Sequence, residues 1–155
     1  MEFSAEQNVN APPEFVFARA TDIDFFKNLA RERGLSMMPT EAFTVIRPGV
    51  GWKLIGEARG RQINHEILVE DYEPEFAFAV STQHRGIKVF IAVEIEKRGN
   101  KKCRLYVDLN ATAKGIGAKL ALKAAQLTGN KLQQKFRRSV RRSAQWLENE
   151  YNRSA

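Results

Sequence analysis

The clearest pattern in the middle of the chain is an alternation of apolar and polar residues. In the segment 60–74, GRQINHEILVEDYEP, apolar side chains recur at every second position. A period of two is typical of a β-strand that has one face in solvent and one face covered. His65 lies in the apolar file, between Ile63 and Ile67. We therefore expect either a hydrogen-bonded core histidine or a face that lines a space entered by polar groups.

The same alternation recurs between short turn signals and predicts six strands from Glu41 to Thr112. Residues 3–9 alternate more weakly and predict a first strand, whereas LSMMPT, residues 35–40, is interpreted as a loop. The result is a seven-stranded antiparallel sheet with one solvated face. Its covered face is predicted to carry Trp52, Leu54, His65, Ile67, Phe76, Phe78, Thr82, Ile91, Val107 and Leu109.

Helical spacing is expected at both ends of the chain. Between residues 11 and 34, paired prolines and a capping Thr21 or Asp22 predict two short helices. A second apolar pattern, in steps of three, four and seven, predicts one long helix from about Gly115 to about Glu150. Gly129 on its apolar side indicates a close approach to the sheet or a kink at LTGN. The apolar side carries Ala118, Leu122, Ala125, Gly129, Leu132, Phe136, Val140 and Leu147.

Composition limits the class of protein. The chain has 155 residues, of which 43% are hydrophobic and 28% charged, which is typical of one globular domain. No run reaches the roughly 18 apolar residues of a membrane-spanning helix, and the start lacks the plan of a signal peptide. The lone Cys103 excludes an internal disulfide and a cysteine-built zinc site. Since the two histidines are far apart in sequence, we expect no metal, no other cofactor and a cytoplasmic location.

Positive charge is concentrated near the C-terminus. The net charge is +7, and residues 113–147 carry nine basic residues and no acid. We expect most of this charge to lie on the solvated side of the long helix. A second hypothesis is contact with an anionic membrane, because Ile116, Leu120 and Leu127 form an extra apolar stripe near Lys119 and Lys123. That stripe could equally pack under the LSMMPT loop. Nucleic acid is an unlikely partner, since no aromatic stacking platform accompanies the basic residues.

The order of elements resembles the START-like, helix-grip (SRPBCC) superfamily, which includes polyketide cyclase/dehydrase-type and lipid-binding proteins. NAPPEFVFARATDIDFF, residues 10–26, is similar to the opening of that superfamily, and GVGWKLIGEARGR, residues 49–61, is similar to its third strand. The resemblance covers nearly the whole chain. It implies a single START-like domain over residues 1–155, of α+β class, with a curved sheet around the long C-terminal helix.

The resemblance also implies an apolar cavity between sheet and helix that holds a lipid, isoprenoid or polyketide-like molecule. A non-enzymatic carrier is the leading hypothesis, because a catalytic site usually needs several convergent polar groups. We expect the ligand to enter beside LSMMPT and the start of the helix. The predicted ligand-binding residues are the ten on the covered sheet face, with Leu122, Ala125 and Gly129 from the helix.

The alternative hypothesis is a cyclase- or dehydratase-type enzyme with His65 as its acid or base. Burying an imidazole among hydrocarbon costs free energy unless its nitrogens find partners, such as Thr82 or an oxygen of the ligand. A catalytic role would also require other polar side chains to converge on His65. Arg47, Asn64 and Arg85, near strand ends, are the candidates for that role.

Overall fold

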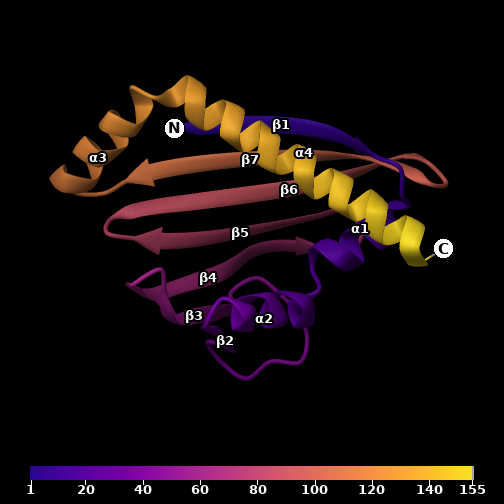
Figure 1. The fold of residues 1–155 in the computed structure, drawn as a ribbon, viewed down its shortest axis with the longest axis horizontal. Helices are drawn as coiled ribbons and strands as arrows, with labels where there is room; N and C mark the ends of the chain where they lie inside the picture. Colours follow the sequence, from indigo (N-terminus) through magenta and orange to yellow (C-terminus); the bar gives the residue numbers. More distant parts are fainter. Residues whose placement is uncertain (155) are drawn as a thin grey trace.

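Seven antiparallel strands form one curved sheet in the computed structural model, which describes residues 1–154 (Figure 1). The first strand pairs with the last, in the order β1-β7-β6-β5-β4-β3-β2. Two short helices follow β1, and a long helix ends the described chain, so the predicted α+β helix-grip architecture is confirmed. The elements are β1 Glu2–Val9, α1 Pro13–Ala20, α2 Ile23–Glu32, β2 Leu35–Pro39, β3 Gly51–Ala58, β4 Arg61–Glu73, β5 Ala77–His84, β6 Ile87–Gly99, β7 Lys102–Ala113, α3 Ile116–Gln126 and α4 Gly129–Ser154.

The strand register brings the alternating apolar residues of neighbouring strands onto one face of the sheet. Ile67 on β4 lies opposite Trp52 on β3 and Thr82 on β5. Ile91 on β6 is paired in the same way with Leu109 on β7. Because directly opposite residues point to the same side of a sheet, these files form a continuous inner face. Helices α1, α2 and α4 lie on this face, with α4 crossing above β1 and β7 (Figure 1).

A β-bulge in β4 keeps the inner face apolar where the alternation would otherwise break. The register shifts between Val69 and Asp71, so that Asp71 pairs with Ala79 and Tyr72 pairs with Phe78. One extra residue on a bulged strand reverses the order of the two faces beyond it. The Tyr72 ring therefore points inward, where it meets the Phe17 ring edge-on at a centroid distance of 5.4 Å.

Fully buried side chains form two separate clusters at the ends of the inner face. The larger one joins β1, α1, β6, β7 and the C-terminal half of α4, and the smaller one joins β3, β4 and the loop before β3. Between them, inner-face residues of β5 and β6 are only partly buried. The core is therefore divided. The larger cluster contains Val9, Ala11, Val16, Phe17, Ile95, Cys103, Leu105, Ala144 and Leu147, and the smaller one Val50, Trp52 and Val69.

The predicted loop at LSMMPT and the predicted strand directly after Glu41 are both wrong. Leu35–Pro39 forms the edge strand β2, in which Met37 pairs with Leu54, and residues 40–50 contain no strand. In this loop Phe43 packs edge-on against Trp52, with ring centroids 5.3 Å apart. The apolar residues of the loop thus serve the smaller cluster without being in a strand, which explains the misleading alternation.

The predicted single C-terminal helix is two helices, and the predicted kink at LTGN is confirmed. The Thr128 amide and hydroxyl both donate to the Ala125 carbonyl, at 3.1 Å and 3.0 Å, which tightens the last turn of α3. The predicted close approach at Gly129 is wrong, since a Cβ added there would meet nothing within 4 Å. A helix α3 of its own therefore leaves the sheet before α4 returns across it (Figure 1).

Candidate functional site

A hollow of about 510 Å³ lies between α4, α2 and the middle of the sheet. Its floor comes from β5, β6 and β7, and Leu105 and Leu147 of the larger cluster form part of its lining. Its walls are aromatic side chains of α2 and α4, with Arg142 and two serines of α4 on the lining as well. The lining residues are Ala20, Phe25, Phe26, Phe78, Val93, Leu105, Val107, Ser139, Val140, Arg142, Ser143, Trp146 and Leu147.

A second hollow, of about 450 Å³, adjoins the first and lies under α2. Phe26 and Phe78 line both hollows, so the two spaces share a wall. Phe26 is nevertheless 36% exposed, which indicates that the shared region opens to solvent. The remaining lining is almost entirely apolar: Ala20, Thr21, Ile23, Leu29, Ala30, Arg33, Leu35, Met37, Trp52, Leu54, Ile67, Val69, Tyr72 and Val80.

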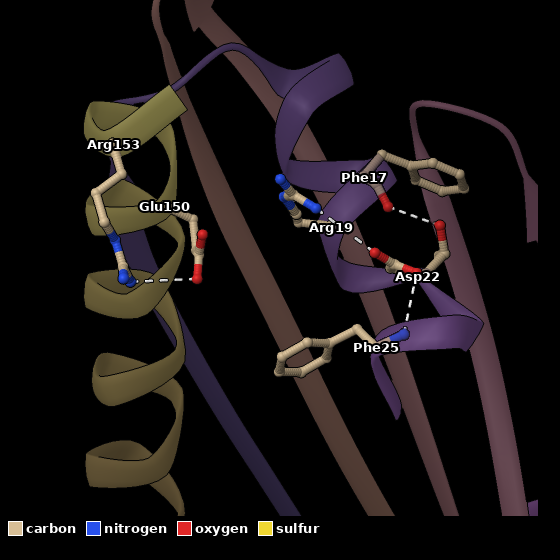
Figure 2. Close-up of polar contacts among 7 residues, drawn as sticks. Phe17, Arg19, Asp22, Phe25, Glu150 and Arg153 are labelled. Atoms are coloured by element: carbon tan, nitrogen blue, oxygen red, sulfur yellow. Dashed lines mark hydrogen bonds and ion pairs between the residues drawn. The ribbon is translucent and has the colours of Figure 1, made fainter. Parts of the chain in front are cut away.

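The corner between α1 and α2 sets the position of the aromatic wall. Asp22 caps α2 by accepting a hydrogen bond from the Phe25 amide at 3.2 Å, and the Arg19 guanidinium lies 3.5 Å from the same carboxylate (Figure 2). A side-chain cap satisfies a free amide of the first turn and fixes where the helix begins. The Phe25 ring then reaches Trp146 of α4 at a centroid distance of 5.0 Å. The cap thus fixes the start of α2 and with it the position of the Phe25 ring against Trp146.

A third hollow, of about 430 Å³, lies at the far end of the inner face and shares Leu54 and Ile67 with the second. Three polar side chains lie in its lining, and two of them are histidines, which neither of the other two hollows contains. His65 comes from β4, whereas Thr82 and His84 come from β5. The complete lining is Leu54, His65, Ile67, Thr82, His84, Ile87 and Val89.

The two histidines of this hollow lie together. The rings of His65 and His84 meet edge-to-face with centroids 5.0 Å apart. Thr82 lies two residues before His84 on β5, opposite Ile67, and its buried Oγ1 has no hydrogen-bond partner within residues 1–154. An unpartnered buried hydroxyl is costly, and an imidazole can donate or accept according to its tautomer. Three groups are therefore free to bind an oxygen atom at the end of an apolar molecule.

Seven of the thirteen predicted ligand-binding residues line one or more of the three hollows. Ile91 and Leu109 lie on the same inner face, opposite each other on β6 and β7. The alternation thus places most of the sheet residues of the site together. The seven are Trp52, Leu54, His65, Ile67, Phe78, Thr82 and Val107.

The other four predicted residues lie elsewhere. Phe76 is 58% exposed and precedes β5, because the turn before it holds Glu75 in the left-handed conformation with φ of 72° and interrupts the alternation. Leu122, Ala125 and Gly129 belong to α3 and to the first residue of α4, beyond the three hollows of the described chain. Their displacement follows from the break between the two helices.

Sequence reasoning missed four residues that shape the site. Phe25, Phe26 and Trp146 form the aromatic wall, and His84 completes the polar group of the third hollow. His84 could have been found, since it continues the file of alternate residues that runs through Thr82. The helix residues could not, because helical spacing does not indicate which side chains of two distant helices meet.

The polar residues that an enzyme would need beside His65 do not converge on it. Arg47 lies in the loop before β3, 3.6 Å from Glu41. Asn64 directly precedes His65 and lies on the opposite face of the sheet, and Arg85 is an exposed residue of the β5–β6 turn. No carboxylate of residues 1–154 lines the third hollow. The side chain that the structure places beside His65 is instead the His84 ring.

Within residues 1–154 no group of three or more His, Cys, Asp and Glu side chains could hold a metal ion. No helix in the same range has the length and apolar character needed to cross a bilayer.

The chain is similar to solved structures but matches no known family by sequence. Neither a protein-family model nor a curated protein matches the chain. The solved structure of Ara h 8.0201 is similar over 97% of both chains, with 14% identity and a TM-score of 0.65. A START superfamily protein from Mycobacterium smegmatis is similar over 99% of both chains, with 18% identity and a TM-score of 0.58.

A third similar structure is the di-domain ARO/CYC protein BexL. The similarity covers 86% of this chain and 43% of BexL, with 13% identity and a TM-score of 0.55. At this level of identity the comparisons show a shared fold and carry no residue roles. The chain has the START-like, helix-grip fold that the sequence resemblance implies.

Proposed function

We propose that the protein binds a small hydrophobic molecule on the inner face of its sheet, under α2 and α4. The observation that carries the proposal is the division of the core into two clusters with apolar hollows between them. Each hollow falls within the roughly 300–1,000 Å³ typical of small-molecule sites. A ligand that removes partly exposed apolar side chains from water lowers the free energy of the complex.

The proposed ligand has an oxygen-bearing group at one end. The third hollow offers the unpartnered Thr82 hydroxyl and the paired rings of His65 and His84. A ligand hydroxyl, carbonyl or carboxylate there would form the hydrogen bond that the buried Thr82 hydroxyl lacks among residues 1–154. The apolar part of the molecule would extend from Leu54 and Ile67 toward α2, since these residues line both the second and the third hollow.

The test is the binding of a fluorescent apolar probe, together with mass analysis of whatever co-purifies with the protein. Val80→Trp would fill the second hollow and is expected to weaken binding of anilinonaphthalene sulfonate about tenfold. Ile55→Trp is the matched control, because Ile55 is 41% exposed and alternates with the inner residues Leu54 and Gly56 of β3. Absence of both probe binding and a co-purifying ligand would refute the proposal.

Thr82→Val tests the polar end. The variant keeps the shape of the side chain and removes the orphaned hydroxyl, so we expect the free protein to unfold with a free energy about 1 kcal/mol higher. Binding of an oxygenated ligand should weaken at the same time, as measured by isothermal titration with the extracted compound. A variant that loses stability and keeps its affinity would show that Thr82 serves the fold alone.

Cyclase or dehydratase chemistry is the second candidate, and the pairing of His65 with His84 is the observation that favours it. Similarity to the ARO/CYC protein BexL agrees with this reading at the level of the fold. A histidine acting as acid or base is normally oriented by a hydrogen-bonding group, and the lining of the third hollow provides no carboxylate for it. Binding without turnover is therefore the better-supported function.

A further inference from the structure

Helix α3 exposes a ridge of large apolar side chains that no other element covers. Ile116, Leu120 and Leu127 are 82%, 63% and 89% exposed, respectively. At 100° per residue these three positions fall within a narrow arc of the helix, so they form one continuous ridge, here called the α3 ridge. Such a ridge costs free energy in water and marks a surface that meets a partner.

The attachment of α3 to the protein keeps the ridge free. Gly115, with φ of 94°, turns the chain out of β7, and Ala118 packs against Gly86 of the β5–β6 turn. A Cβ added at Gly86 would lie 3.0 Å from the Ala118 Cβ, so the two backbones are in close contact there. The rest of α3 extends beyond the ends of β6 and β7 (Figure 1). The alternative that the stripe packs under residues 35–40 does not hold, because those residues form the opposite edge strand.

The charge around the ridge is uniformly positive. Lys119 and Lys123 are exposed on α3 itself, and Lys114 precedes it. From residue 109 to residue 147 the sequence has no acidic residue. None of the nine lysines and arginines of residues 113–147 forms an ion pair with another side chain of the described chain. The partner therefore has to combine an apolar layer with negative charge.

We infer that α3 docks the protein on a bilayer that contains anionic lipids. Ile116, Leu120 and Leu127 would enter the boundary between headgroups and acyl chains, while Lys119 and Lys123 contact the headgroups. A helix with an aliphatic face beside lysines is the usual form of such a surface anchor. A nucleic acid fits less well, because the ridge is aliphatic and provides no ring for base stacking.

Docking through α3 would also bring one end of the proposed ligand site close to the bilayer. Ile87 lines the third hollow and pairs with Ala113, only three residues before α3. The docking itself does not depend on the ligand, because it is argued from α3 alone. The two proposals can therefore fail separately.

Co-sedimentation with vesicles tests the inference. We expect wild-type protein to bind vesicles of equal parts phosphatidylcholine and phosphatidylglycerol, to bind more weakly as salt rises, and to ignore vesicles of phosphatidylcholine alone. The double variant Ile116→Ser, Leu120→Ser should bind the mixed vesicles at least about tenfold more weakly. Val45→Ser is the matched control, since Val45 is 67% exposed in the loop before β3, and its binding should be unchanged.

A second variant tests directly whether the α3 ridge enters the bilayer, without relying on a loss of binding. Leu120→Trp should shift its emission to shorter wavelength on the mixed vesicles and be quenched by brominated acyl chains, because the ring would leave water. Absence of wild-type binding, equal binding to neutral vesicles, or full binding by the double variant would each overturn the inference. Tight binding to an oligonucleotide that persists in the double serine variant would also overturn it, because the lysines and arginines would then bind without the α3 ridge.

Discussion

Helices α3 and α4 are consecutive, both basic and both amphipathic, yet their apolar sides have opposite surroundings. In α4, Val140, Ala144 and Leu147 are buried against the sheet and α1. In α3, Ala118 is buried while Leu120 is 63% exposed. Helical periodicity therefore identifies the apolar side of a helix, which is stabilised when another surface covers it. Whether that surface belongs to the same chain depends on the tertiary fold.

The largest difference between the two helices is expected in the free energy of unfolding, when one leucine of each is truncated to alanine. Leu147→Ala in α4 should lower the free energy of unfolding by about 3 kcal/mol, because Leu147 is 4% exposed and its loss leaves a cavity in the larger cluster. Leu120→Ala in α3 should change it by less than about 0.5 kcal/mol. Urea denaturation followed by circular dichroism measures both. Similar losses in the two variants would mean that α3 is held by the fold as firmly as α4.

Thiol reactivity gives the second contrast. Cys103 is fully buried in the larger cluster, and this burial raises the pKa of its thiol to about 11 from an ordinary 9.0. Two units correspond to a roughly hundredfold smaller thiolate fraction, and the thiolate is the reactive form. A cysteine introduced by Leu120→Cys should therefore react with a maleimide reagent at least about a hundredfold faster than Cys103.

The raised pKa also predicts how stability depends on alkaline pH. Above pH 9 the unfolded chain loses the Cys103 proton while the folded chain keeps it, so the free energy of unfolding should fall as the pH rises toward about 11. Cys103→Ala is the control, because it removes this titration. Fast labelling of Cys103 in the native protein would show that the cluster beneath α4 opens readily.

The smallest effect concerns the junction of the two helices. Gly129→Ala should raise the free energy of unfolding by about 0.5 kcal/mol, because alanine favours the helical backbone and the new Cβ would meet nothing within 4 Å. Thermal unfolding followed by circular dichroism is the measurement. A loss of stability would indicate that the chain at Gly129 approaches another element more closely than its surroundings suggest.

The sheet could be predicted from the sequence because its signal is local. In strands of period two, the residues beside His65 already determine which side chains share its face. The helix-grip order followed from the same alternation and from the turn residues. The total of seven strands was reached because a false strand after Glu41 replaced the missed strand β2. The prediction broke down at Phe76 and at residues 35–50, where turn geometry and the packing of Phe43 on Trp52 replaced strand pairing.

The site was less accessible because its walls come from contacts between distant elements. The meeting of Phe25 with Trp146 depends on the angle between α2 and α4, which no local pattern encodes. The break after Gln126 has the same origin, since the apolar spacing continues through it and favours one uninterrupted helix. His84 is the exception, because the alternation along β5 already pointed it toward the face that carries His65.

The β4 bulge has a consequence for how this chain can change over time. With the extra residue, Tyr72 faces Phe17 and Asp71 faces water. Deleting Glu70, the extra residue, would remove the bulge and still leave Asp71 paired with Ala79 and Tyr72 with Phe78. A single-residue deletion should therefore be tolerated at the bulge, whereas a deletion elsewhere in the strand would exchange its two faces.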